Sequence, residues 1–289
     1  KKKKKLFAIQ EKNIATLPLC VNKMDGIIDG FWDANYEIWT PFDCAFEIGP
    51  QNLDNQIHQV LKNEWILFLG DSNTRGVAKI LCETLSLPII GDRLLRFVCI
   101  GPWITISYWM YWPTTLEIDK VYNETFNEFV TNLKNDGKYN GTIPYFPIPN
   151  CPTFVFLSVG SHSSHYVYHE MSGLQHQITH VLPSNVRKDR FSLLLITASN
   201  NRLLPDSMKG IAIRQTNPRI NEKNQATVKI ANSLDPPVPV MDFFSTTFVL
   251  GVNEKSDDAL HFSPLVSKTH LIYVLEFIHS RKNVSHICT

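Results

Sequence analysis

Apolar runs alternate with stretches of helical spacing along most of the chain. The apolar runs predict buried strands at residues 65–69, 96–111, 153–159, 191–197 and 238–241, the second being one long strand or a strand pair. Helix-like runs predict helices at residues 74–85, 121–133, 169–182 and 264–279, and residues 121–133 show helical spacing of their apolar positions. Small polar residues follow the strands, so we expect an α/β fold with a mostly parallel sheet and a site along its carboxyl edge.

The N-terminal part of the chain does not follow this pattern. Glycine and proline interrupt it repeatedly, which predicts an irregular segment. Trp32, Trp39 and Phe42 would anchor this segment to the core, and Cys20 and Cys44 would suit a disulfide that tethers it. We therefore divide the chain into an irregular N-terminal segment, residues 1–60, and an α/β domain, residues 61–289.

Composition narrows the class of protein. Hydrophobic residues make up 44% of the chain and charged residues 19%, which is enough apolar material for a sizeable core. The net charge is +1, from 28 basic and 27 acidic residues, which argues against a nucleic-acid partner. Residues 97–116 carry no charge, but Gly101, Pro102 and Pro113 interrupt them. We therefore expect core strand there and no membrane span.

Cysteine usage and glycosylation signals indicate an oxidising compartment. The six cysteines form no CxxC pair and no Cys/His metal spacing, and they allow 15 disulfide pairings between which the sequence does not choose. Asn-x-Ser/Thr sequons occur at Asn123, Asn140 and Asn283, in polar stretches that we expect to be exposed. The sequence therefore predicts a glycoprotein that is secreted or resides in the ER or Golgi lumen.

The sharpest local signal is Gly70-Asp71-Ser72, at the turn from a predicted strand into a predicted helix. A serine held there presents its hydroxyl at the sheet edge, where backbone N–H groups favour a developing oxyanion. The alternative is that Asp71 and Ser72 only cap the helix, since both residue types are preferred N-caps.

A second signal, Asp257-Asp258-Ala259-Leu260-His261, lies near the C-terminus. A serine becomes a good nucleophile when a histidine takes its proton and a carboxylate orients that histidine. Asp258, three residues before His261, would suit this role, and Asp257 is the alternative carboxylate. Otherwise the pair is a capping aspartate and a surface histidine. This chemistry needs no cofactor, and we find no metal-ligand spacing.

Taken together, the two signals resemble the GDSL/SGNH hydrolase superfamily, and upstream residues narrow the resemblance to its PC-esterase branch. The blocks that carry it are Gly30-Phe31-Trp32, Trp39-Thr40-Pro41, Cys44, Gly-Asp-Ser-x-x-Arg ending at Arg75, residues 105–109, and Gly160-Ser161-His162. They look like blocks of cadherin-like and PC-esterase proteins and of trichome-birefringence-like O-acetyltransferases. The resemblance implies an SGNH-like three-layer sandwich and a serine acyl-esterase or O-acetyltransferase that acts on glycan hydroxyls through Ser72, Asp258 and His261.

One position departs from the family pattern. The third block often has an asparagine two residues before its glycine, where this chain has Ser158. In SGNH enzymes that asparagine donates a hydrogen bond to the oxyanion, and losing such a donor costs roughly 3 to 4 kcal/mol. The backbone N–H groups of Ser72 and of Gly101 or Gly160 are the other candidate donors. Ser158, Ser161 or Asn200 would replace the asparagine only if the fold directs them correctly.

The remaining candidates have two interpretations each. Arg75 would hold a carboxylate or the acyl donor or orient the triad acid, or would simply pair with Asp71. His162 would line the cleft or be a bystander, and the tryptophans near residues 103–112 would stack on sugars or fill the core. The partner expected is a glycan or glycoprotein, and any membrane attachment would lie outside this chain. The alternative function is a catalytically impaired SGNH scaffold used for glycan binding or adhesion.

Overall fold

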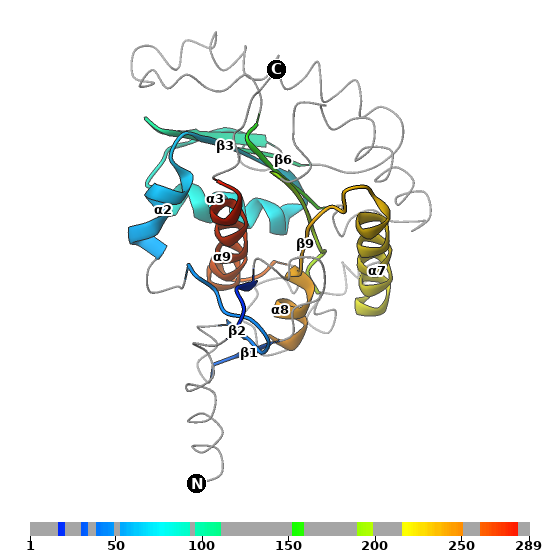
Figure 1. Cartoon of the computed structure of the whole chain (residues 1–289). Coiled ribbons are helices and arrows are strands. Elements are labelled where there is room, and N and C mark those ends of the chain that lie inside the picture. The colour runs from blue at the N-terminus through cyan, green and yellow to red at the C-terminus, as the bar shows by residue number, and fades with distance from the viewer. Residues whose placement is uncertain are drawn as a thin grey trace.

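A seven-stranded sheet forms the centre of the computed structural model (Figure 1), with strand order β4-β5-β6-β3-β7-β8-β9. The structure describes residues 17–20, 30–33, 39–48, 53–92, 96–110, 152–158, 190–198, 216–250 and 261–282. The five strands from β6 to β9 run parallel, whereas β4 and β5 pair antiparallel at one edge. The α/β class and the mostly parallel sheet are as expected.

The strands of the sheet are β3 (Glu64–Gly70), β4 (Ile89–Asp92), β5 (Arg96–Ile100), β6 (Ile104–Met110), β7 (Phe154–Ser158), β8 (Phe191–Leu194) and β9 (Val240–Met241). The helices described are α2 (Leu53–Leu61), α3 (Ser72–Thr84), α7 (Asn217–Ser233), α8 (Phe243–Leu250) and α9 (Pro264–Arg281). All five predicted strands are present, and the second is a strand pair. The helices expected at residues 121–133 and 169–182 lie outside the described residues.

Two hydrophobic clusters pack on opposite faces of the sheet and make three layers. One contains Phe68 and Ile106 with side chains of α2, α3, α8 and α9. The other contains Leu67 and Val155 with side chains of α7. Successive residues of a strand point to opposite faces, so strands that are buried on both faces must be continuously apolar. The residues of β3 and β7 are all buried, which explains their uninterrupted apolar runs.

The described parts of the N-terminal segment pack on the core and are more regular than expected. Strands β1 (Gly30–Trp32) and β2 (Trp39–Pro41) pair antiparallel, and α2 occupies residues 53–61. Contacts with the main domain stabilise these short elements. One of them is the hydrogen bond that the Trp32 indole N–H donates to the Thr246 carbonyl at 2.8 Å. The disulfide between Cys20 and Cys44 forms as the sequence suggested.

A second disulfide, between Cys82 of α3 and Cys99 of β5, joins a helix to the antiparallel edge. Every described cysteine is paired. Disulfides are typical of oxidising compartments, which agrees with the secretory expectation. None of the described helices is both long enough and apolar enough to cross a membrane.

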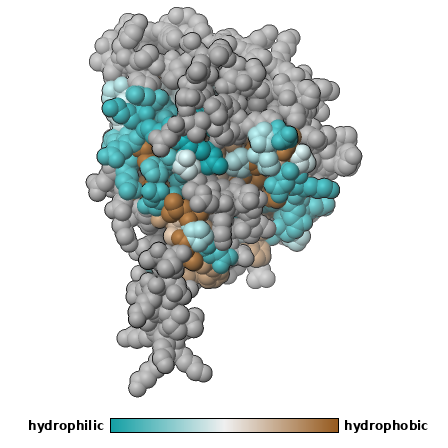
Figure 2. Space-filling model, in the orientation of Figure 1, coloured by the Kyte–Doolittle hydropathy of each residue, from teal (hydrophilic) through white to brown (hydrophobic). Residues whose placement is uncertain are grey.

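On the face shown in Figure 2, the described surface is mostly hydrophilic, with a hydrophobic area low in the view. This area lies over the part of the molecule that holds β1, β2 and α8 in Figure 1. Leu19, Phe42 and Phe248 are the large hydrophobic side chains that are exposed among the described residues. Phe42 was expected to anchor the N-terminal segment to the core but is exposed, whereas Trp32 and Trp39 are buried as expected.

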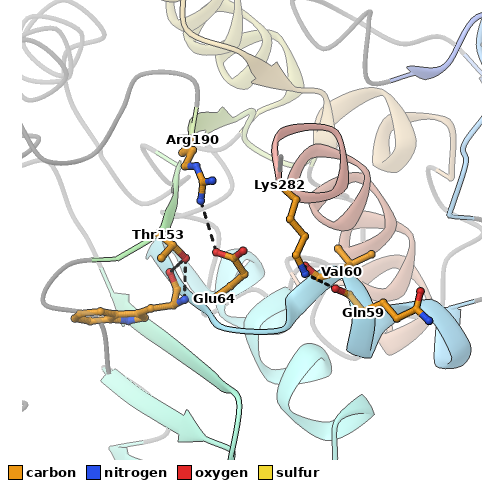
Figure 3. Close-up of polar contacts among 7 residues, drawn as sticks. Gln59, Val60, Glu64, Thr153, Arg190 and Lys282 are labelled. Atoms are coloured by element: carbon orange, nitrogen blue, oxygen red, sulfur yellow. Dashed lines mark hydrogen bonds and ion pairs between the residues drawn. The ribbon is translucent and has the colours of Figure 1, made fainter. Parts of the chain in front are cut away.

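A polar cluster, buried at Glu64, Thr153 and Arg190, joins the elements at the amino edge of the parallel strands (Figure 3). The Arg190 guanidinium lies 3.7 Å from the Glu64 carboxylate, and the Thr153 hydroxyl accepts the Trp65 N–H at 2.8 Å. The Lys282 ammonium donates to carbonyl groups at the end of α2. Burial raises the pKa of Glu64, and the nearby positive charges oppose that shift. The cluster lies at the opposite edge from Ser72.

Candidate active site

The central strand β3 ends in the turn that carries Ser72. Asp71 is the N-cap of α3, and its carboxylate accepts the N–H groups of Asn73 at 3.0 Å and Thr74 at 3.1 Å. Ser72 is therefore the first residue of the helix and stands at the carboxyl edge of the sheet. Asp71 does cap the helix, as the alternative interpretation held. This cap fixes the start of α3 and therefore the position of the Ser72 hydroxyl at the sheet edge.

Gly70 is required at this turn by the close approach of neighbouring side chains. A Cβ atom added to Gly70 would stand 2.6 Å from the Thr74 hydroxyl oxygen, 2.9 Å from Thr74 Cβ and 3.1 Å from Ser158 Cβ. Any larger residue would push the turn away from α3 and β7. The glycine thus holds the strand end and the helix start together directly before the serine.

His261 meets Ser72 across 189 residues of sequence. Its Nε2 atom lies 2.7 Å from the Ser72 hydroxyl oxygen, and both side chains are half-buried. His261 precedes α9, which packs against α3 so closely that a Cβ on Gly76 would stand 3.0 Å from the Ser267 hydroxyl. The helix pair therefore brings the histidine to the start of α3. Asp257 and Asp258 lie outside the described residues.

The backbone N–H groups at the helix start have distinct roles. Those of Asn73 and Thr74 donate to the Asp71 carboxylate, and that of Arg75 donates to the Asp71 carbonyl at 2.9 Å. Among the described residues the Ser72 N–H has no hydrogen-bond partner. We expected the N–H groups of the first turn to face an oxyanion. The Ser72 N–H is the one of these groups that is not already used by Asp71.

The expectation that Gly101 supplies an oxyanion donor is wrong. Gly101 lies in the tight turn between β5 and β6, and its N–H donates to the Ile104 carbonyl at 2.8 Å. Ile104 pairs with Glu64 at the start of β3, whereas Met110 pairs with Gly70 at its end. Six strand residues separate the two levels, which places Gly101 roughly 20 Å from the Ser72 turn. Because residues 96–110 form a hairpin, Gly101 lies at the amino edge of the parallel strands, opposite the edge that carries Ser72.

Ser158 and Arg75 both lie at the Ser72 edge. Ser158 is the last residue of β7 and is buried, and its Cβ lies against Gly70. Arg75 is half-buried, one helical turn after Asp71. The other proposed site and glycosylation residues lie outside the described residues: Gly160, Ser161, His162, Asn200, Asn123, Asn140 and Asn283.

Sequence reasoning did not identify a polar contact beside the serine. The Asn73 side-chain amide donates to the Thr197 hydroxyl at 2.9 Å, from the loop that follows β8. That loop is held in turn by Thr247 of α8, whose hydroxyl accepts the Ala198 N–H at 2.8 Å. Thr197, the polar residue that ends the predicted strand 191–197, was the available signal, but its partner was not apparent from the sequence.

Tyr108 also reaches this turn and was not identified. Its hydroxyl lies 3.1 Å from the Gly70 carbonyl oxygen and 3.0 Å from the Asp71 carbonyl oxygen. Burial, with a further contribution from the Asp71 charge, raises the pKa of Tyr108 well above its ordinary value. The hydroxyl therefore stays protonated, and its single proton is shared between the two carbonyl oxygens.

The chain is similar in fold to a solved hydrolase at low sequence identity. The crystal structure of the lipase/acylhydrolase from Enterococcus faecalis aligns with a TM-score of 0.47 and 14% identity, over 75% of this chain and 96% of that chain. No family model matches the sequence, and no curated protein matches it. At this identity and TM-score the similarity says nothing about catalytic residues or substrate.

Proposed function

We propose that this protein is a serine acyl-esterase or O-acetyltransferase of the PC-esterase type that acts on glycan hydroxyls. The observation that carries the proposal is the 2.7 Å contact between Ser72 Oγ and His261 Nε2. The chain brings together a serine at a strand-to-helix turn and a histidine from a distant segment, within the distance that proton transfer requires. A capping serine would not need a histidine partner.

The chemistry follows from the positions of these atoms. Ser72 Oγ attacks the ester carbonyl carbon while His261 Nε2 takes the hydroxyl proton, and the carbonyl oxygen becomes an oxyanion that the Ser72 N–H stabilises. The C–O bond to the leaving alcohol then breaks, and His261 returns the proton to that alcohol. Water or a sugar hydroxyl next attacks the acyl-serine, with His261 again as base. The C–O bond to Ser72 Oγ breaks, and His261 returns the proton to that oxygen. Asp258 would hold the tautomer in which Nε2 accepts.

The substrate class rests on the family resemblance and on one structural feature. Trp109 pairs with Leu69 in the sheet, near the Ser72 end, and is only partly buried, so its ring could stack on a sugar. Trp103 is also partly buried, but it packs beside His58 at the other edge of the sheet, with ring centroids 4.8 Å apart, and so lies far from Ser72.

The compartment is part of the same proposal. A secreted or luminal protein would carry glycans on Asn123, Asn140 and Asn283 when it is made in a secretory host. Intact-mass measurement before and after enzymatic deglycosylation tests this expectation, and three unmodified asparagines would contradict it. The two described disulfides support an oxidising compartment.

The competing function is a glycan-binding scaffold without activity, and Ser158 in place of the expected asparagine favours it. Labelling by a fluorophosphonate probe separates the two, because a working serine reacts with the probe and an inert one does not. We expect labelling of the wild type and its loss in Ser72→Ala. A wild type that is not labelled, and binds glycans without hydrolysing acetyl esters, would establish the scaffold function.

The triad assignment has its own test. We expect His261→Ala to abolish turnover of a generic acetyl ester while thermal unfolding stays close to that of the wild type, because His261 is half-buried. Asp258→Asn should lower turnover strongly through the wrong histidine tautomer, with Asp257→Asn as the matched control. If Asp257→Asn is the harmful change, the carboxylate was assigned to the wrong residue.

A further inference from the structure

The peptide group between Asp71 and Ser72 has both of its polar ends near the proposed chemistry. Its N–H belongs to Ser72 and has no partner among the described residues. Its carbonyl belongs to Asp71 and accepts two hydrogen bonds, from the Arg75 N–H at 2.9 Å and from the Tyr108 hydroxyl at 3.0 Å. A peptide group is planar, so whatever fixes the carbonyl direction also fixes the N–H direction.

The Tyr108 hydroxyl fixes that plane from a rigid position. The side chain is 1% exposed, and its ring packs on Phe97 with centroids 5.3 Å apart. Tyr108 pairs with Phe68 in the β3–β6 register, so the strand beside the nucleophile strand carries it. The same hydroxyl lies 3.1 Å from the Gly70 carbonyl, and it therefore connects the last two peptide groups before Ser72.

A hydrogen bond to a peptide carbonyl also strengthens the N–H of the same peptide group. Hydrogen bonds in a chain polarise one another, and the effect is larger where water is excluded. The Tyr108 hydroxyl would thus make the Ser72 N–H a better donor as well as a better oriented one. Asn73 and Thr74 do not need this support, because their N–H groups are already held by the Asp71 carboxylate.

We propose that Tyr108 is a positioning residue that aims and polarises the Ser72 N–H toward the oxyanion of the transition state. This inference rests on the proposed acyl-transfer function and deepens it. Tyr108 does not touch the substrate and acts through the Asp71–Ser72 peptide group. It would compensate in part for Ser158, where the family pattern has an asparagine donor.

The test is Tyr108→Phe, which removes the hydroxyl and keeps the ring. We expect kcat on an acetyl ester to fall about tenfold with KM within twofold. Removing a whole oxyanion donor costs about 10²- to 10³-fold, and here the Arg75 N–H still holds the Asp71 carbonyl. The rate of fluorophosphonate labelling should fall in parallel, because the probe's phosphoryl oxygen would occupy the same position. The shape of the pH–rate profile should not change, because His261 still acts as the base.

The matched control is Tyr273→Phe, which removes another buried tyrosine hydroxyl. That hydroxyl accepts the Trp39 indole N–H at 3.0 Å and lies in the helix α9 core. Titration with the fluorophosphonate counts competent sites in each preparation, so that a misfolded fraction does not lower the measured kcat. We expect Tyr273→Phe to reduce thermal stability and to leave kcat per competent site unchanged.

The outcomes are separable. Suppose that the wild type turns over the ester and that the kcat of Tyr108→Phe lies within twofold of the kcat of Tyr273→Phe. This result would overturn the positioning role of Tyr108 and leave the proposed function intact. A tenfold fall confined to KM would also overturn it, since an oxyanion donor acts on the transition state. A wild type with neither turnover nor labelling would overturn the proposed function, and with it this inference.

Discussion

Glu276 of α9 should make the stability of this protein depend on pH in an unusual direction. Its side chain is 1% exposed, and one carboxylate oxygen accepts the Ile48 N–H, which attaches the N-terminal segment to α9. The other oxygen, Oε2, has no partner among the described residues. Burial raises the pKa of Glu276 from 4.5 to about 7, and the charge of Glu47 adds to this effect.

The sign of the effect follows from proton uptake. Between pH 4.5 and pH 7 the folded protein keeps a proton on Glu276 that the unfolded chain releases. The free energy of unfolding therefore decreases as the pH rises through this range and levels off above it. At 1.36 kcal/mol per pKa unit, the loss between pH 5 and pH 8 is at most about 2.5 kcal/mol.

Glu276→Gln is the perturbation that isolates this contribution. The amide keeps an oxygen for the Ile48 N–H and does not ionise. We expect urea unfolding, with disulfides intact, to show a smaller loss of stability from pH 5 to pH 8 in the variant than in the wild type. Glu47→Gln is the control, and its effect should be smaller, because Glu47 is not the largest contribution to the shift. Equal pH dependence in wild type and Glu276→Gln would refute the reasoning.

Three further changes test the site and its support. Gly70→Ala should cost about 1 to 3 kcal/mol of stability by overpacking and lower esterase activity, and unchanged urea unfolding would contradict the close contacts seen there. Ser158→Asn should raise kcat by at most about 10²- to 10³-fold if it restores a donor, with Ser72→Ala as the background; a loss of activity would show that Ser158 does not face the oxyanion. Replacing both Cys82 and Cys99 by alanine should lower the free energy of unfolding by about 3 kcal/mol through lost loop constraint, and an unchanged melting temperature would argue against this.

Much of the fold was predictable from the sequence because buried parallel strands leave a strong pattern. The runs at residues 65–69, 153–158 and 191–197 have both faces covered, so polar residues are nearly excluded from them. The closing helix α9 was predictable for a similar reason, since it is buried on nearly all sides. These signals come from local burial, which acts on each segment separately.

Helix α7 and strand β4 were not predicted, because neither has a strong local pattern. Helix α7 is largely polar and presents a narrow stripe to the sheet, and its buried Asn224 binds both the Ile196 N–H and carbonyl at 2.8 and 2.9 Å. Strand β4 includes Gly91 and relies on pairing with β5. Their structures depend on partners that are distant in sequence, and periodicity does not report such partners.

The sequence by itself determined the strand-to-helix turn at Ser72 and the presence of an Asp-x-x-His segment near the end of the chain. Only the tertiary structure decided that His261 reaches Ser72, that Tyr108 holds the preceding peptide groups, and that Gly101 lies at the opposite edge. Turns and buried runs are local, because the residues that make them are neighbours in the chain. Contacts across 189 residues depend on sheet order and helix packing, which follow from the whole core at once.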